Sequence, residues 1–171
     1  MDAKIAREIF RYDADTGKLY WRKISGNQVR PGQEITCKSD RGYLYVKFRG
    51  KRYKAHRVIW LMTYGSWPKN DVDHIDHDTS NNRLSNLRDV TKRQNHRNLP
   101  MFKSNTSGVT GVSFYKRSKK WVVKAYGADG KQKHIGYFAD FDDAVAARDK
   151  AYLERGYHQN HGLPREVAAS Q

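Results

Sequence analysis

Cysteine is nearly absent from this chain of 171 residues, and acidic residues are outnumbered by basic ones. The single cysteine, Cys37, excludes a disulfide within the chain and a structural zinc site of four cysteines. No apolar run approaches the ~20 residues that a membrane-spanning helix needs, and the first residues lack the apolar stretch of a signal peptide. We therefore expect a cytoplasmic protein that has no membrane partner.

Positive charge is what the chain has in excess. It carries 33 Lys and Arg against 18 Asp and Glu, which gives a formal net charge of +15. The basic residues are spread over sequence that looks folded, which indicates a polyanion, and nucleic acid in particular, as partner. The length suits one ordinary domain or two small ones, and a hydrophobic share of 37% allows modest cores.

The first sixty residues alternate apolar and polar side chains in the manner of short strands. We expect one strand over residues 18–22 and a hairpin that joins residues 42–48 to 51–55 through Arg49-Gly50. A short core helix is predicted over residues 56–64, where the apolar side chains have helical spacing. His56, at the start of that helix, could contact DNA but is assigned to packing or capping and not to catalysis.

The predicted hairpin is strongly basic. Seven Lys or Arg and no acid lie between Arg41 and Arg57, so one face can lie along phosphates or can simply be solvated. Further along, a basic polar stretch at residues 92–97 can form a helix. The candidate DNA-contacting side chains of these two regions are Arg52, Lys54, Arg57, Arg93 and Arg97.

Residues 71–98 hold a spaced set of polar side chains. Asp73-His74 is followed twelve residues after His74 by Asn86, and nine further on by Asn95. The pattern predicts a strand, a loop, a second short strand and a helix. That order would bring Asp73 and His74 opposite Asn95, with Asn86 nearby.

This set suits hydrolysis of a phosphodiester bond. A histidine with a pKa near its ordinary ~6.5 can take a proton from water at physiological pH, so His74 is the candidate general base. Asp73 and Asn95 offer oxygen ligands, which favour a hard cation such as Mg²⁺ over zinc. The Asn86 amide oxygen would accept the other ring N–H of His74 and so select its tautomer.

The chain from about residue 10 to residue 98 resembles the HNH endonucleases of the phage and free-standing homing type. The resemblance is carried by residues 55–60, 72–76, 81–88 and 94–98. It implies a ββα-metal fold that nicks or cuts DNA with one divalent cation, Mg²⁺ or another such as Mn²⁺. If the protein is encoded by a phage, the expected compartment is the cytoplasm of the host cell.

The resemblance also implies a role for each residue of the motif. Asp73 matches the metal ligand before the base, His74 the base, Asn86 the orienting residue and Asn95 the second metal ligand, which makes an H-N-N variant. A register slip of one residue would give the ligand role to His96 instead. His77 stands where this family usually has glycine; it could tune the loop or supply an extra metal ligand, but we expect it to be an exposed turn residue.

The chain after residue 100 has a second pattern. Residues 101–107 are polar and lack periodicity, so they are interpreted as a linker. Three strands are then predicted, at residues 111–116, 121–126 and 133–138, and a helix that begins at Asp140 or Asp142 and continues to about Glu154. The expected structure is a three-stranded antiparallel sheet backed by one helix.

Charge indicates which side of this sheet would contact DNA. Residues 111–138 contain seven Lys or Arg and one acid, whereas residues 140–154 contain two basic and five acidic residues. The sheet is therefore the expected binding side. In the middle strand, the period of two places Trp121, Val123 and Ala125 on one face and Val122, Lys124 and Tyr126 on the outward face.

Residues from about 107 to 162 resemble the AP2 DNA-binding domain. The resemblance is carried by Gly111-Val112, Trp121, residues 135–138 and the alanine-rich helix, and that family lays its sheet in the major groove. The plant members are richer in Arg and Trp at the contact positions, so base specificity does not carry over. By position the resemblance implies contacts from Ser113, Tyr115, Lys124, Tyr126, Gln132 and His134.

The sequence thus predicts an α+β protein with a ββα-metal HNH nuclease domain and an AP2-like domain. The predicted boundaries are 1–100 for the nuclease domain with its core at about 71–98, 101–107 for the linker, 108–162 for the AP2-like domain and 163–171 for a tail. The expected partner is double-stranded DNA, and two DNA-contacting regions would let a monomer hold a long site. The alternative is a DNA-binding regulator or architectural protein with an inactive HNH fold; RNA binding is a weaker third.

Overall fold

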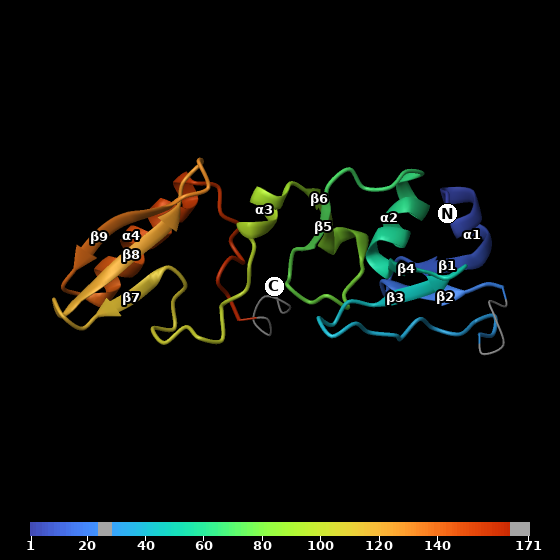
Figure 1. The fold of residues 1–171 in the computed structure, drawn as a ribbon, viewed down its shortest axis with the longest axis horizontal. Helices are drawn as coiled ribbons and strands as arrows, with labels where there is room; N and C mark the ends of the chain where they lie inside the picture. The colour runs from blue at the N-terminus through green and yellow to red at the C-terminus, as the bar shows by residue number, and fades with distance from the viewer. Residues whose placement is uncertain (24–28, 165–171) are drawn as a thin grey trace. The chain divides into compact units, whose positions relative to one another are not determined.

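The computed structural model describes residues 1–23 and 29–164, and it forms two compact units (Figure 1). The first unit is Met1–Thr91 and the second is Lys92–Gln171. Each unit has a small hydrophobic core; the described residues of the first unit form three two-stranded antiparallel sheets and those of the second form one three-stranded sheet. None of the helices in the described residues has the length and apolar character needed to cross a membrane. The predicted domain and linker boundaries remain predictions.

The first unit begins with a helix that the strand-like pattern did not predict. Helix α1 (Ala3–Ile9) starts after Asp2, whose Oδ1 accepts the backbone N–H of Ile5 at 2.8 Å. Its alanines at positions 3 and 6 are buried, so its small face packs closely in the core. The expectation of strands throughout the first sixty residues is therefore wrong here, because a capping aspartate and a buried alanine face favour a helix.

The predicted strands and core helix of the first unit are confirmed. Strand β1 (Phe10–Asp13) pairs with β2 (Lys18–Trp21), and β3 (Tyr45–Phe48) pairs with β4 (Lys51–Lys54). Helix α2 (Ala55–Tyr64) follows directly and ends at Gly65, which adopts the left-handed conformation with φ 79°. Glycine takes that conformation without the steric cost that a side chain would add. The core is built around fully buried Phe10, Val46, Val58, Ile59 and Leu61.

A two-stranded sheet carries the polar segment. Strand β5 (Asp71–His74) pairs antiparallel with β6 (Leu87–Val90), and the 3₁₀ helix η1 (Leu84–Asn86) immediately precedes β6. Asp73 lies opposite Arg88 in this register, and His74 lies opposite Leu87. Val72 and Leu87 belong to the hydrophobic core. The core therefore holds β5 in place, and Asp73 and His74 stand at its C-terminal end.

The second unit contains the predicted sheet and helix. It begins with helix α3 (Lys92–His96), followed by strands β7 (Val112–Tyr115), β8 (Lys120–Tyr126) and β9 (Gln132–Phe138) in the antiparallel order β7-β8-β9. Helix α4 (Phe141–Glu154) covers one face of this sheet (Figure 1). Asp140 caps α4, because its side chain accepts the backbone N–H groups of residues 142 and 143.

The predicted faces of the middle strand are confirmed at four positions. Val123 and Ala125 are buried, and Lys124 and Tyr126 are exposed. The prediction is wrong for Val122, which is only 6% exposed. Strand β8 is central, so Val122 has a cross-strand neighbour on each side, one on β7 and one on β9.

The chain leaving α3 is tied to the chain that follows α4. His158 N–H donates to the Arg97 carbonyl at 2.8 Å, and Gly162 N–H donates to the Leu99 carbonyl at 2.8 Å. Met101 N–H donates to the carbonyl of residue 163 at 3.0 Å. These bonds join α3 to the rest of the second unit. Residues 165–171, most of the predicted tail, lie outside the described residues.

Candidate active site

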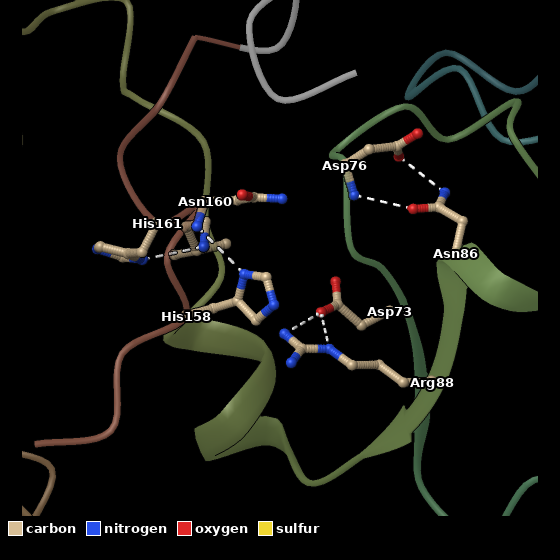
Figure 2. A network of polar contacts seen from close by, with 8 residues as sticks. Asp73, Asp76, Asn86, Arg88, His158, Asn160 and His161 are labelled. Carbon is tan, nitrogen blue, oxygen red and sulfur yellow. Dashed lines mark hydrogen bonds and ion pairs between the residues drawn. The ribbon is translucent and has the colours of Figure 1, made fainter. Parts of the chain in front are cut away.

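Asp73 and His74 are the central pair of the candidate site. Both side chains are buried, at 8% and 4% exposure. Asp73 Oδ2 accepts hydrogen bonds from Arg88 Nε at 2.9 Å and Nη2 at 2.7 Å (Figure 2). Since Arg88 lies directly opposite Asp73 in the β5–β6 pair, the ion pair orients the carboxylate. Arg88 was not among the residues predicted for the site.

The ring of His74 is held by Asn82. His74 Nε2 lies 2.9 Å from Asn82 Oδ1, and Asn82 is only 2% exposed. An amide oxygen can only accept a hydrogen bond, so this contact requires the proton of neutral His74 to be on Nε2. The lone pair is then on Nδ1, which is the nitrogen able to take a proton.

Asn86 holds the loop after β5 instead of the histidine ring. Its Oδ1 accepts the backbone N–H of Asp76 at 3.0 Å, and its Nδ2 donates to Asp76 Oδ1 at 2.8 Å (Figure 2). The same Nδ2 also donates to the Asn81 carbonyl at 2.9 Å. These contacts use the acceptor and both donors of the amide. The prediction that Asn86 orients the His74 ring is therefore wrong in its geometry, because the ring nitrogen Nε2 meets the amide oxygen of Asn82, while Asn86 bonds to Asp76 and Asn81. Its wider catalytic role remains a prediction.

Aromatic rings surround the face of His74. The His56 ring packs edge-on against it at a centroid distance of 4.9 Å, and the Tyr43 ring lies 5.8 Å away. Burial lowers the pKa of His74, although the Asn82 contact and nearby Asp76 act in the opposite direction. At neutral pH the ring is therefore neutral and able to accept a proton. This state suits a general base.

His56 is part of this environment, a role beyond the packing or capping assigned from the sequence. It is 2% exposed, and burial lowers its pKa to about 2, reinforced by the repulsion that His56 would meet from His74 if both rings were protonated. Its Nδ1 has no hydrogen-bond partner among the described residues. A signal was present in the sequence, because His56 lies in one of the four segments that carry the HNH resemblance.

The low pKa of His56 makes stability depend on pH. The unfolded chain binds a proton below pH ~6.5 and the folded chain does not, so stability is full above that pH and falls below it. Between pH 6.5 and 5 we expect a loss of about 2 kcal/mol, at about 1.36 kcal/mol per pH unit. Thermal unfolding at pH 7, 6 and 5 measures it. His56→Leu should make the profile less steep without flattening it, because the lowered pKa of His74 acts in the same direction. A melting temperature that is equal at pH 7 and 5 in the unmodified protein would contradict the expectation.

His77 differs from its predicted environment. It is 6% exposed and adopts a left-handed conformation with φ 64°, so the expectation of an exposed turn residue is wrong. The backbone turns sharply here, with His77 N–H donating to the His74 carbonyl at 3.1 Å. Glycine adopts that conformation freely, which accounts for the glycine usual at this position in the resembling family.

The predicted second metal ligand lies on α3, in the second unit. Asn95 is half-buried there and His96 is exposed. Among the described residues there is no group of three His, Cys, Asp or Glu side chains that could hold a metal. The carboxylate of Asp73 has about four acceptor positions, so pairing with Arg88 and binding of a hard cation are compatible. The choice between Asn95 and His96 remains open.

The basic residues of the first unit have different environments. Arg52 and Lys54 are exposed on β4, where the Arg52 guanidinium lies 4.9 Å from the Tyr45 ring centroid and the Lys54 ammonium 4.5 Å from that of Tyr43. Arg57 is half-buried and donates to the carbonyl of Asn70 at 2.9 Å. It therefore ties α2 to the chain before β5, and its contact with DNA is a prediction.

The second unit brings many of the predicted DNA-contacting residues to one cavity. Its volume is about 890 Å³, and its lining includes six of them: Arg93, Arg97, Ser113, Lys124, Tyr126 and Gln132. The sequence placed these residues on a helix and on a sheet without relating the two. Tyr115 and His134 are exposed on β7 and β9 and do not line the cavity.

Comparison with known proteins gives three findings. A family model described as HNH endonuclease matches residues 53–97. A solved structure entitled "DNA binding and cleavage by the HNH homing endonuclease I-HmuI" aligns with 94% of this chain and 93% of its own, at 21% identity and a TM-score of 0.42. Protein 3.8 of Escherichia phage T7 is 39% identical over 87 residues, which are 48% of this chain and 71% of that protein. The chain belongs to the family of this phage protein, and it carries an HNH endonuclease domain.

Proposed function

We propose that the protein is a metal-dependent DNA endonuclease of the phage HNH homing type that hydrolyses phosphodiester bonds. The observation that carries the proposal is the paired arrangement at the end of β5, inside the segment that matches the HNH family. There a neutral, oriented His74 adjoins Asp73, whose carboxylate is oriented by Arg88.

Each residue of the first unit has a distinct task in the proposed reaction. His74 takes a proton from the attacking water at Nδ1. Asn82 keeps the ring in the required tautomer through its contact with Nε2. Asn86 acts indirectly: it holds the loop that contains Asp76 and Asn81, and that loop follows the strand that carries His74. Together these contacts keep the base in position before DNA arrives.

HNH nucleases generally use a divalent metal ion. In this chain Asp73 would hold it together with Asn95, or with His96 if the register is shifted by one residue. Oxygen ligands favour Mg²⁺ or Mn²⁺. When bound, such an ion neutralises charge that develops on the leaving oxygen.

Double-stranded DNA is the proposed substrate, and the proposed acting form is a monomer. The net charge of +15 and the exposed basic side chains of β4 support binding to a polyanion.

We assign the AP2-like part, residues 108–162, to positioning the substrate and residues 1–100 to cutting it. The exposed Lys124 and Tyr126 on the sheet support that assignment.

A binding protein with an inactive HNH fold is the second candidate. The ion pair between Arg88 and Asp73 favours it, because the arginine already offers positive charge to the proposed metal ligand. A regulator of this kind would bind DNA equally well with and without a metal and would leave it intact.

Conversion of supercoiled plasmid to nicked or linear forms decides between the two. We expect cleavage with Mg²⁺ or Mn²⁺ and none with EDTA, since the proposed reaction needs the cation. A nicked product would indicate that one strand is cut, and a linear product that both are. Tight binding without cleavage, tested on plasmid and on phage DNA with both metals, would contradict the endonuclease and support the regulator.

A further inference from the structure

The cavity of the second unit has aromatic walls. Tyr152 and Tyr157 stack with their ring centroids 4.0 Å apart and an interplanar angle of 7°. Two further lining residues, Phe102 and Tyr126, are 64% and 53% exposed. Large exposed aromatic rings beside a concave surface are typical of a binding site, because a ligand can remove them from water.

The charged residues of the cavity all have the same sign. Lys92 and Arg93 come from α3, Arg97 from the turn after it and Lys124 from β8. Asp and Glu do not occur among the described residues that line the cavity. The lining therefore combines cations with aromatic rings, which is the combination that holds the phosphates and bases of an unpaired nucleic acid strand.

Several contacts form this cavity without a ligand. The backbone bonds between residues 97–101 and 158–163 join α3 to the chain that follows α4. Tyr157 Oη accepts the backbone N–H of Tyr126 at 2.8 Å. Gly111 has φ 86°, and a Cβ at that position would collide with the Tyr152 hydroxyl. The aromatic wall is thus held by bonds and close packing within the unit.

We propose that this cavity accepts one unstacked nucleotide of the DNA substrate. The base would lie against the aromatic residues, and its flanking phosphates would pair with the lysines and arginines. The volume of about 890 Å³ is within the roughly 300–1,000 Å³ of ordinary small-molecule sites. A sheet that reads an intact major groove needs no such depression. The inference rests on the proposed function in taking DNA as the substrate.

Binding to a bulged duplex tests the proposal. The full chain is titrated, in EDTA, onto a duplex with one extrahelical 2-aminopurine and onto the fully paired duplex of the same sequence. We expect binding to the bulged duplex to be roughly five- to a hundredfold tighter, which is the effect of stacking one base on an aromatic side chain. A change in 2-aminopurine fluorescence should accompany binding.

Two exposed tyrosines provide a matched pair of variants. Tyr126→Ala removes a residue that lines the cavity, whereas Tyr137→Ala removes one on β9 that does not line it and is 54% exposed. We expect Tyr126→Ala to abolish most of the preference for the bulged duplex and Tyr137→Ala to retain it. Because both side chains are exposed, neither substitution disturbs the core.

The outcomes separate this inference from the proposed function. Equal affinity for the two duplexes, or equal loss of preference in both variants, would overturn the nucleotide site even if the plasmid is cut. A preference for the bulged duplex that depends on Tyr126, without cleavage in any metal, would support the site and overturn the endonuclease. Absence of DNA binding would overturn both.

Discussion

Replacement of His74 by alanine is expected to lower the rate of metal-dependent DNA cleavage by two to four orders of magnitude, about the contribution of a positioned general base. DNA affinity should stay unchanged, because the ring is only 4% exposed at the end of β5. Single-turnover cleavage at saturating DNA measures the rate. Equilibrium binding in EDTA measures the affinity.

A second histidine variant separates chemistry from binding. His134→Ala removes an exposed histidine of β9 that belongs to the predicted DNA-contacting set. At saturating DNA it should cut at the rate of the unmodified protein, even if more protein is needed to saturate. If His74→Ala also retained that rate, His74 would not be the base.

Replacement of Asp73 by asparagine is expected to reduce cleavage by about a hundredfold or more. A bound cation is worth several kcal/mol to the transition state of a phosphoryl reaction, and each 1.36 kcal/mol is about tenfold in rate. The substitution removes the charge that would hold the cation and retains the shape of the side chain. Rates measured over a range of Mg²⁺ and Mn²⁺ concentrations should show a higher metal requirement.

Asp71→Asn is the matched control for this variant. Asp71 lies two residues earlier on β5, opposite Val90. Its replacement by asparagine removes the same negative charge as the replacement of Asp73. It should cut at the normal rate and with the normal metal requirement. Asp73→Asn also breaks the ion pair between Asp73 and Arg88. Thermal unfolding of both variants shows whether that loss lowers the stability of the protein. An unchanged metal requirement in a folded Asp73→Asn protein would contradict its assignment as a ligand.

The sequence predicted those parts of the fold that depend on neighbouring residues. Alternation and turn residues are local patterns, so the β3–β4 hairpin and the three strands β7, β8 and β9 were predicted correctly. The helical spacing of apolar residues predicted α2, and the capping aspartate predicted the start of α4. Helix α1 was missed because its seven residues are too few for the periodicity to be clear.

The partners of the candidate site needed the tertiary structure. Spacing placed Asp73, His74 and Asn86 in one segment, but it could not show that Asn82 would contact the histidine ring while Asn86 held the loop. Both are asparagines in the same turn-rich stretch, and only the path of the loop determines which amide meets the ring.

The sequence by itself determined the basic charge that indicates a polyanionic partner, most of the local secondary structure and the segment that carries the motif, because charge and periodicity are properties of the chain alone. Only the tertiary structure showed the pairing of Arg88 with Asp73, the burial of His56 against His74 and the cavity of the second unit. Each of these depends on residues distant in sequence coming within contact of one another, and packing decides which of them do so.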